Sequence, residues 1–145
     1  MSFELRDHTA DVAVEATASD LSGVFAAVAD GLAAAGCDSI PETGGERFDV
    51  AVRAEGVEAL LFDYLDQLIY ERDVRGVLPA DNAAAVRGPD DGAERCDDEA
   101  WRLEGSARGI PLSAVDAREI KAVTYSEMAV AETDDGWRAY VVLDV

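Results

Sequence analysis

Two stretches of the chain carry the hydrophobic spacing of amphipathic helices. Over residues 21–36, apolar side chains recur every three or four positions, as they do in a helix with one buried face. Ser19 is placed to cap the start of this helix, with Asp20 in its first turn. Residues 57–72 repeat the spacing over a broader apolar face, with the acids on the opposite side. The pattern therefore predicts two helices that contribute to one core.

Shorter segments around the helices alternate apolar and polar residues, as strands with one buried face do. Two strand–helix units followed by a run of strands predict a single α+β domain over residues 1–145. In it, two helices pack on a mostly antiparallel or mixed β-sheet. The predicted strands are 12–18, 48–52, 82–86, 101–105, 120–130 and 137–143, with loops at 38–46 and 87–99 and a hairpin turn at 134–136.

Charge is the one unusual feature of the composition. Thirty-one acidic residues stand against twelve basic ones, a formal net charge of -19, and the acids are spread through every segment. We interpret this as surface adaptation to a halophilic, salt-rich cytoplasm, with an ordinary acidic protein as the alternative. Direct binding to a phosphate backbone uses clusters of lysine and arginine, which the sequence lacks. We therefore expect no direct nucleic-acid binding, and a role in RNA metabolism only through another protein.

Several kinds of site are excluded or disfavoured by residue content. His8 is the only histidine, so a metal site with several imidazoles is excluded, and a structural or a functional role for His8 stays open. Cys37 and Cys96 lack metal-ligand or redox spacing and are expected to be buried thiols. No phosphate-binding glycine loop is present, and no apolar run reaches the roughly 18–20 residues that span a bilayer. A cytoplasmic protein with oxygen-based metal chemistry remains.

Lys121 is the only lysine beside eleven arginines, which makes it a candidate functional residue, with a chance surface lysine as the alternative. The acidic loop at 87–99 does not match the spacing of a calcium-binding loop. With so many acids, composition alone selects no carboxylate pair.

Four segments in order resemble the archease family, and together they cover nearly the whole chain. They are His-Thr-Ala-Asp-Val at 8–12, the helix segment at 60–70, Glu-Ile-Lys-Ala-Val-Thr-Tyr at 119–125, and the stretch from Trp137 to Val145. Many family members carry a histidine after the tyrosine of the third segment, where this chain has Ser126. A second imidazole ligand is therefore not available.

The resemblance implies a non-catalytic accessory protein that activates an RtcB-type tRNA-splicing ligase. Such a protein promotes guanylylation of the ligase's catalytic histidine, allows multiple turnover and is associated with broader nucleotide use. It also implies a divalent cation, calcium in the family with magnesium or manganese as alternatives, bound here by Asp11, Asp144 and Val145. Lys121 would belong to the same functional surface.

Such a site is chemically reasonable, because a cation relieves the repulsion between carboxylates and prefers hard oxygen ligands. Two other functions stay open. One is a free-standing metal-dependent phosphoesterase or nucleotide hydrolase. The other is a chaperone or scaffold whose acids serve only salt tolerance.

Overall fold

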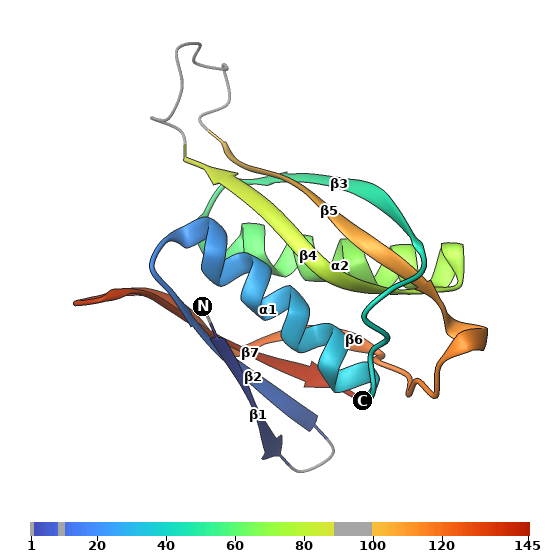
Figure 1. The fold of residues 1–145 in the computed structure, drawn as a ribbon. Coiled ribbons are helices and arrows are strands. Elements are labelled where there is room, and N and C mark those ends of the chain that lie inside the picture. Colours follow the sequence, from blue (N-terminus) through green and yellow to red (C-terminus); the bar gives the residue numbers. More distant parts are fainter. Residues whose placement is uncertain (1, 9–10, 89–99) are drawn as a thin grey trace.

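A computed structural model of the chain describes residues 2–8, 11–88 and 100–145, and the side chains of residues 2, 4–8, 11 and 126 lie outside this description. The elements alternate between strands and helices in the first half and are strands thereafter (Figure 1). In chain order they are β1 (Ser2–His8), β2 (Asp11–Ala18), α1 (Leu21–Gly36), β3 (Glu46–Ala54), α2 (Val57–Arg75), β4 (Val77–Arg87), β5 (Trp101–Pro111), the short 3-10 helix η1 (Leu112–Ala114), β6 (Ala122–Thr133) and β7 (Gly136–Asp144).

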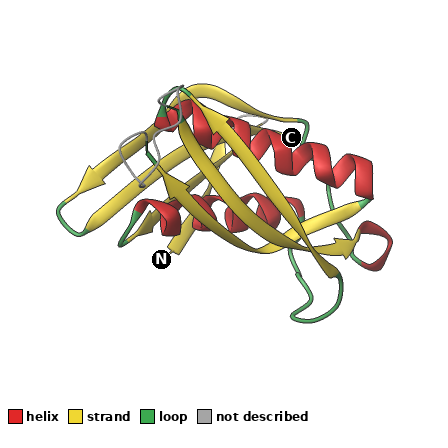
Figure 2. Cartoon of the chain, turned by 90° about the horizontal axis from the view of Figure 1, so that it is seen from above, coloured by secondary structure: helices red, strands yellow, loops and turns green. Residues whose placement is uncertain are grey.

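The strands form two separate sheets with the helices between them. One sheet has the order β1-β2-β7-β6 and the other β3-β5-β4, and every pairing between described strands is antiparallel. Helix α1 contacts β1, β2 and β7 on one side and β4 on the other, while α2 contacts β6 and all three strands of the smaller sheet. From above, the strands of the smaller sheet run across both helices (Figure 2).

The core fills the space between the sheets. The four-stranded sheet contributes the fully buried side chains of Val14 in β2 and Leu143 in β7, and the three-stranded sheet contributes the buried side chain of Leu103 in β5. Phe25 and Tyr64 join the helices through stacked rings whose centroids are 6.3 Å apart. Burial of large apolar side chains is the dominant stabilising term for such a core.

The predicted α+β class, with two helices on antiparallel strands, is confirmed, and the structure adds that the strands form two sheets. The helix layer separates them, a division that local periodicity does not encode. The predicted cap of α1 is wrong by one residue, because Asp20 is the last extended residue and its Oδ1 accepts from Gly23 N–H at 2.6 Å. Helix α2 runs to Arg75 and ends at Gly76, whose φ of 66° is left-handed.

Two strands differ most from the prediction. Strand β1 was not predicted; it has only seven residues, of which three are charged and only Phe3 and Leu5 are apolar. Strand β4 was predicted only over 82–86, although it begins at Val77, because a bulge between Ala80 and Ala83 interrupts its alternation. Of the two cysteines, Cys37 is a buried free thiol as predicted, and Cys96 lies outside the described residues, as does most of the predicted loop at 87–99.

Candidate functional site

The end of β1, the start of β2 and the C-terminal end of β7 meet at one end of the four-stranded sheet. Backbone register places Asp11 of β2 directly opposite Asp144 of β7. On the flanking strands, His8 is the register partner of Asp11, and Ala122 is the register partner of Asp144. A row of four residues, His8–Asp11–Asp144–Ala122, thus crosses all four strands, and we call it the terminal row.

The terminal row belongs to the outer face of the sheet. In β2 and β7, the alternate residues Val14 and Leu143 pack into the core between the sheets. Directly opposed residues of antiparallel strands share a face, with about 4.5–5.5 Å between Cβ atoms. The register therefore assigns Asp11 and Asp144 to the same outer face, next to the C-terminal end of β7 (Figure 1).

Lys121 joins the terminal row through the backbone. Its N–H donates to the carbonyl oxygen of Asp144 at 2.8 Å, which holds the residue before Ala122 against the end of β7. The Lys121 side chain is exposed, and its ammonium makes no ion pair with any described residue. The lone lysine and the acid pair, remote in sequence, are neighbours in the fold.

Asp144 is half-buried, and its carboxylate has no hydrogen bond or ion pair with a described residue. Val145 is also half-buried and packs against the core cluster, which positions its main-chain oxygen atoms beside Asp144. The side chains of His8 and Asp11 lie outside the described residues. These placements bring the predicted site residues together at the level of the backbone, and metal binding stays a prediction.

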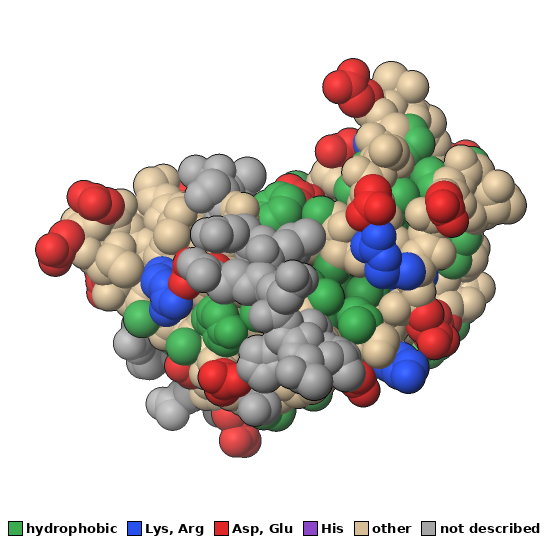
Figure 3. Space-filling view, turned by 90° about the horizontal axis from the view of Figure 1, so that it is seen from below, with side chains coloured by type: hydrophobic (Ala, Val, Ile, Leu, Met, Phe, Trp, Pro, Cys, Tyr) green, Lys and Arg blue, Asp and Glu red, His purple; other side chains and the backbone are tan. Residues whose placement is uncertain are grey.

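Other acids do not form a competing metal centre in the described part of the chain. Among described side chains, no group of three or more histidines, cysteines, aspartates or glutamates is close enough to hold a metal ion. From below, the acidic side chains that are drawn are scattered around the face rather than gathered in one patch (Figure 3).

Asp30 is a half-buried acid of α1, and its role is structural. From α1, its Oδ1 accepts from Asn82 N–H at 2.9 Å and from Asn82 Nδ2 at 3.0 Å. Asn82 lies in the β4 bulge beside Asp81, whose φ is 47°. Burial raises the pKa of Asp30, while the hydrogen bonds from Asn82 oppose the rise. This carboxylate fixes the bulge against α1 and lies apart from the terminal row.

A family model described as the archease protein family matches residues 3–145 of the chain. The chain belongs to the archease family. The resemblance seen in its four sequence segments is thereby confirmed.

Individual archeases match over their full length. The chain is 32% identical to the protein archease of Archaeoglobus fulgidus, covering 100% of both sequences. It is 31% identical to the protein archease of Thermococcus gammatolerans, covering 99% of this chain and 98% of the relative.

Solved structures agree with the fold. The solution structure of Methanobacterium thermoautotrophicum protein 1598 superposes with a TM-score of 0.77 at 28% identity, covering 99% of this chain and 98% of that one. The crystal structure of an archease from Thermotoga maritima, described as a possible chaperone, gives a TM-score of 0.63 at 21% identity, covering 97% and 94%. At that identity the second comparison supports the fold alone. No helix in the described part of this archease is both long and apolar enough to cross a membrane.

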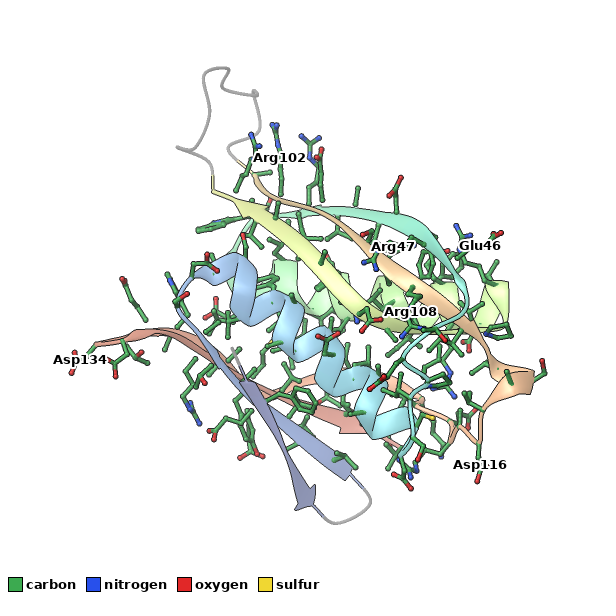
Figure 4. All side chains as sticks on the ribbon, viewed as in Figure 1. Glu46, Arg47, Arg102, Arg108, Asp116 and Asp134 are labelled. Carbon is green, nitrogen blue, oxygen red and sulfur yellow. The ribbon has the colours of Figure 1, made fainter. Side chains whose placement is uncertain are left out.

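One feature of this archease was missed at the level of the sequence. Arg102 of β5 is the register partner of both Arg53 of β3 and Arg87 of β4, so three arginines cross the smaller sheet in one row. Arg47 and Arg108 are also opposed, further along the sheet from Arg102 (Figure 4). The sequence has no linear basic cluster, but sheet register gathers these arginines on one face. The expected lack of direct nucleic-acid binding stays a prediction.

Proposed function

We propose that this archease activates an RtcB-type tRNA-splicing ligase by promoting guanylylation of the ligase's catalytic histidine. In this role the chain is not itself an enzyme. It allows the ligase multiple turnover and broadens its use of nucleotides. Family membership over residues 3–145 supports the partner. The observation that carries the proposal is the register pair Asp11–Asp144 with the Lys121 N–H bound to the Asp144 carbonyl oxygen.

The metal ion in this proposal is bound at the terminal row by Asp11, Asp144 and main-chain oxygen of Val145. The residues fit a hard divalent cation, because they are all oxygen donors and the half-buried Asp144 carboxylate has no partner among the described residues. Calcium is the expected ion, with magnesium or manganese as alternatives. Asp11 and Asp144 are register partners in the backbone, and a bound cation would offset the repulsion between their two carboxylates.

Lys121 and His8 complete the proposed working surface. The backbone hydrogen bond to Asp144 keeps Lys121 beside the metal ligands, where an ammonium can contact a nucleotide phosphate or a ligase carboxylate. His8 stands at the other end of the terminal row, next to Asp11 in register.

A guanylylation assay on the purified ligase tests the proposal. We expect Asp11→Ala and Asp144→Ala to lower the rate of ligase–GMP formation toward the rate without archease. Asp116→Asn and Asp134→Asn are matched controls, because both remove one exposed acid outside the terminal row, and they should activate fully. If Asp11→Ala activates as well as the unmodified protein, the assignment of the working surface is wrong.

Calorimetric titration with calcium and with magnesium tests the metal site separately. We expect stoichiometric binding that Asp144→Ala abolishes and Asp134→Asn leaves intact. If the unmodified chain binds both calcium and magnesium only weakly and without a fixed stoichiometry, a scaffold whose acids serve only salt tolerance would be favoured. Turnover of nucleotides or RNA by the chain alone, abolished by a chelator, would instead favour the phosphoesterase.

A further inference from the structure

An exposed aromatic stack joins helix α2 to strand β6. The rings of Phe62 and Tyr125 lie 4.2 Å apart between centroids and are tilted by only 3°. Phe62 is half-buried against the core, so the stack is anchored from within. Tyr125 is nevertheless 54% exposed, which leaves much of its ring open to solvent. The stack thus presents a rigidly supported aromatic surface at the edge of the fold.

The backbone of β6 is shaped around this tyrosine. Strand β6 is one of the two outer strands of the four-stranded sheet, and its pairing with β7 is irregular between Thr124 and Ala129. Within that irregular stretch, Glu127 has a φ of 61°, a conformation that costs a non-glycine residue about 1–3 kcal/mol. A bulge of this kind also blocks simple strand addition at a sheet edge. This edge is therefore suited to side-chain recognition rather than to extension of the sheet.

Further along α2, two more apolar side chains are exposed, separated from Phe62 by the exposed Asp66. Tyr70 and Val74 are 57% and 63% exposed, and with Tyr125 they make up three of the four large exposed hydrophobic side chains of the described residues. Phe62, Tyr70 and Val74 are spaced at multiples of four residues, so they follow one ridge of the helix. From Phe62 to Val74 the ridge is about 18 Å long, at roughly 1.5 Å per residue.

The same helix face carries a rim of acids. Asp63, Asp66 and Asp73 are all exposed and lie between or beside the ridge residues. Burial, and then the neighbouring Asp66 charge, raises the pKa of Asp63, so a cation here would relieve an existing repulsion. We call Phe62, Tyr70, Val74 and Tyr125, with these three acids, the aromatic face.

We propose that the aromatic face is the docking surface for a basic segment of the ligase, with an arginine of that segment stacked on the Tyr125 ring. The inference rests on the proposed function and adds the surface by which the partner is held. An arginine guanidinium suits both features of the face, because it stacks on aromatic rings and pairs with carboxylates. A nucleic acid does not, since its phosphates would lie against Asp63, Asp66 and Asp73.

The location agrees with this role. Tyr125 follows Lys121 by four residues of extended chain, about 13 Å at roughly 3.3 Å per residue. Tyr125 lies on the helix side of β6, as does Val123, whereas the terminal row lies on the outer face of the sheet. A partner docked at the aromatic face would therefore reach the terminal row around the β6 edge, without using its residues for docking. Tyrosine and arginine are enriched among the few residues that dominate the binding energy of protein interfaces.

Binding of the archease to immobilised ligase, measured by biolayer interferometry, tests the proposal. We expect Tyr125→Ala to weaken binding at least about tenfold and Tyr125→Phe, which keeps the ring, to bind within about twofold of the unmodified protein. Asp66→Asn should weaken binding several-fold and make it less sensitive to salt. Phe3→Ala is the matched control, because Phe3 is also exposed but lies on β1.

The outcomes separate the two proposals. If the unmodified chain binds the ligase but Tyr125→Ala and Asp66→Asn bind equally well, the docking surface is wrong while the proposed function stands. If the unmodified chain does not bind the ligase, both are wrong. Melting temperatures within about 3 °C of the unmodified protein exclude unfolding as the cause of lost binding. Asp66→Asn changes an exposed side chain and keeps the test open if Tyr125→Ala unfolds.

Discussion

Replacing Asp30 by alanine removes the carboxylate that joins α1 to the bulge of β4. Two hydrogen bonds from Asn82 are lost, at 2.9 Å from its N–H and 3.0 Å from its Nδ2. Nδ2 keeps a contact to Pro79 O at 3.3 Å, so the backbone N–H of this buried residue is the group left without an acceptor. A buried donor left unsatisfied costs about 1–3 kcal/mol. We expect Asp30→Ala to lower the free energy of unfolding by about 2 kcal/mol.

Asp30→Asn separates the hydrogen bonds from the charge. An asparagine oxygen can accept both bonds from Asn82, so its free energy of unfolding at neutral pH should lie within about 1 kcal/mol of the unmodified protein. The raised pKa of Asp30 means that the folded chain holds this proton more tightly than the unfolded chain, whose value is 3.8. The contribution of Asp30 to the free energy of unfolding is therefore most favourable below pH 3.8 and declines as the pH rises through the raised pKa of the folded state.

Urea denaturation of the three proteins between about pH 4 and pH 7 measures both effects. The free energy of unfolding of Asp30→Asn, relative to the unmodified protein, should rise with pH across this window and then level off. A flat difference would refute the account of the titration. Asp30→Ala as stable as Asp30→Asn would refute the role assigned to the hydrogen bonds.

Three further predictions concern other elements of the fold. Gly136→Ala should lower the melting temperature by several degrees in differential scanning calorimetry, because the φ of Gly136 is 148° and a Cβ there would collide with Ala18 O. Gly44→Ala should lower the melting temperature less, because Gly44 has a φ of 98° but open space around it. Equal losses in the two variants would contradict the collision. Arg118→Ala should lower the free energy of unfolding, measured in urea, by about 1–2 kcal/mol and should also lower ligase activation. The reason is that Arg118 donates to Ala35 O at the end of α1 and holds the segment that leads to Lys121. Full activation would contradict this positioning role. Asp144→Asn should lower calcium affinity in calorimetry at least about tenfold without changing the melting temperature in chelator, and unchanged affinity would remove the Asp144 carboxylate from the metal site.

Sequence periodicity predicted the helices well because each buries one regular stripe in the core. Leu60, Leu61 and Leu65 recur on one face of α2 and are fully buried. The same logic missed β1, in which only Phe3 and Leu5 are apolar. It also gave no reason to separate the strands into two sheets, because pairing between strands is a non-local property.

The candidate site shows the same limit more strongly. Charge and spacing could not select Asp11 and Asp144 from thirty-one acids, and only family resemblance singled them out. Strand register then placed them opposite each other. The Phe62–Tyr125 stack and the arginine row on the smaller sheet have no local sequence signal, since each is formed by residues from different elements.

Multiple-turnover RNA ligation by the ligase, with archease in excess, tests most directly whether the terminal row is the working surface. With the unmodified archease, we expect ligated product well beyond one equivalent per ligase molecule. With Asp144→Ala, we expect about one equivalent or less, while Asp134→Asn should match the unmodified protein. Full multiple turnover with Asp144→Ala would contradict a working surface at the terminal row.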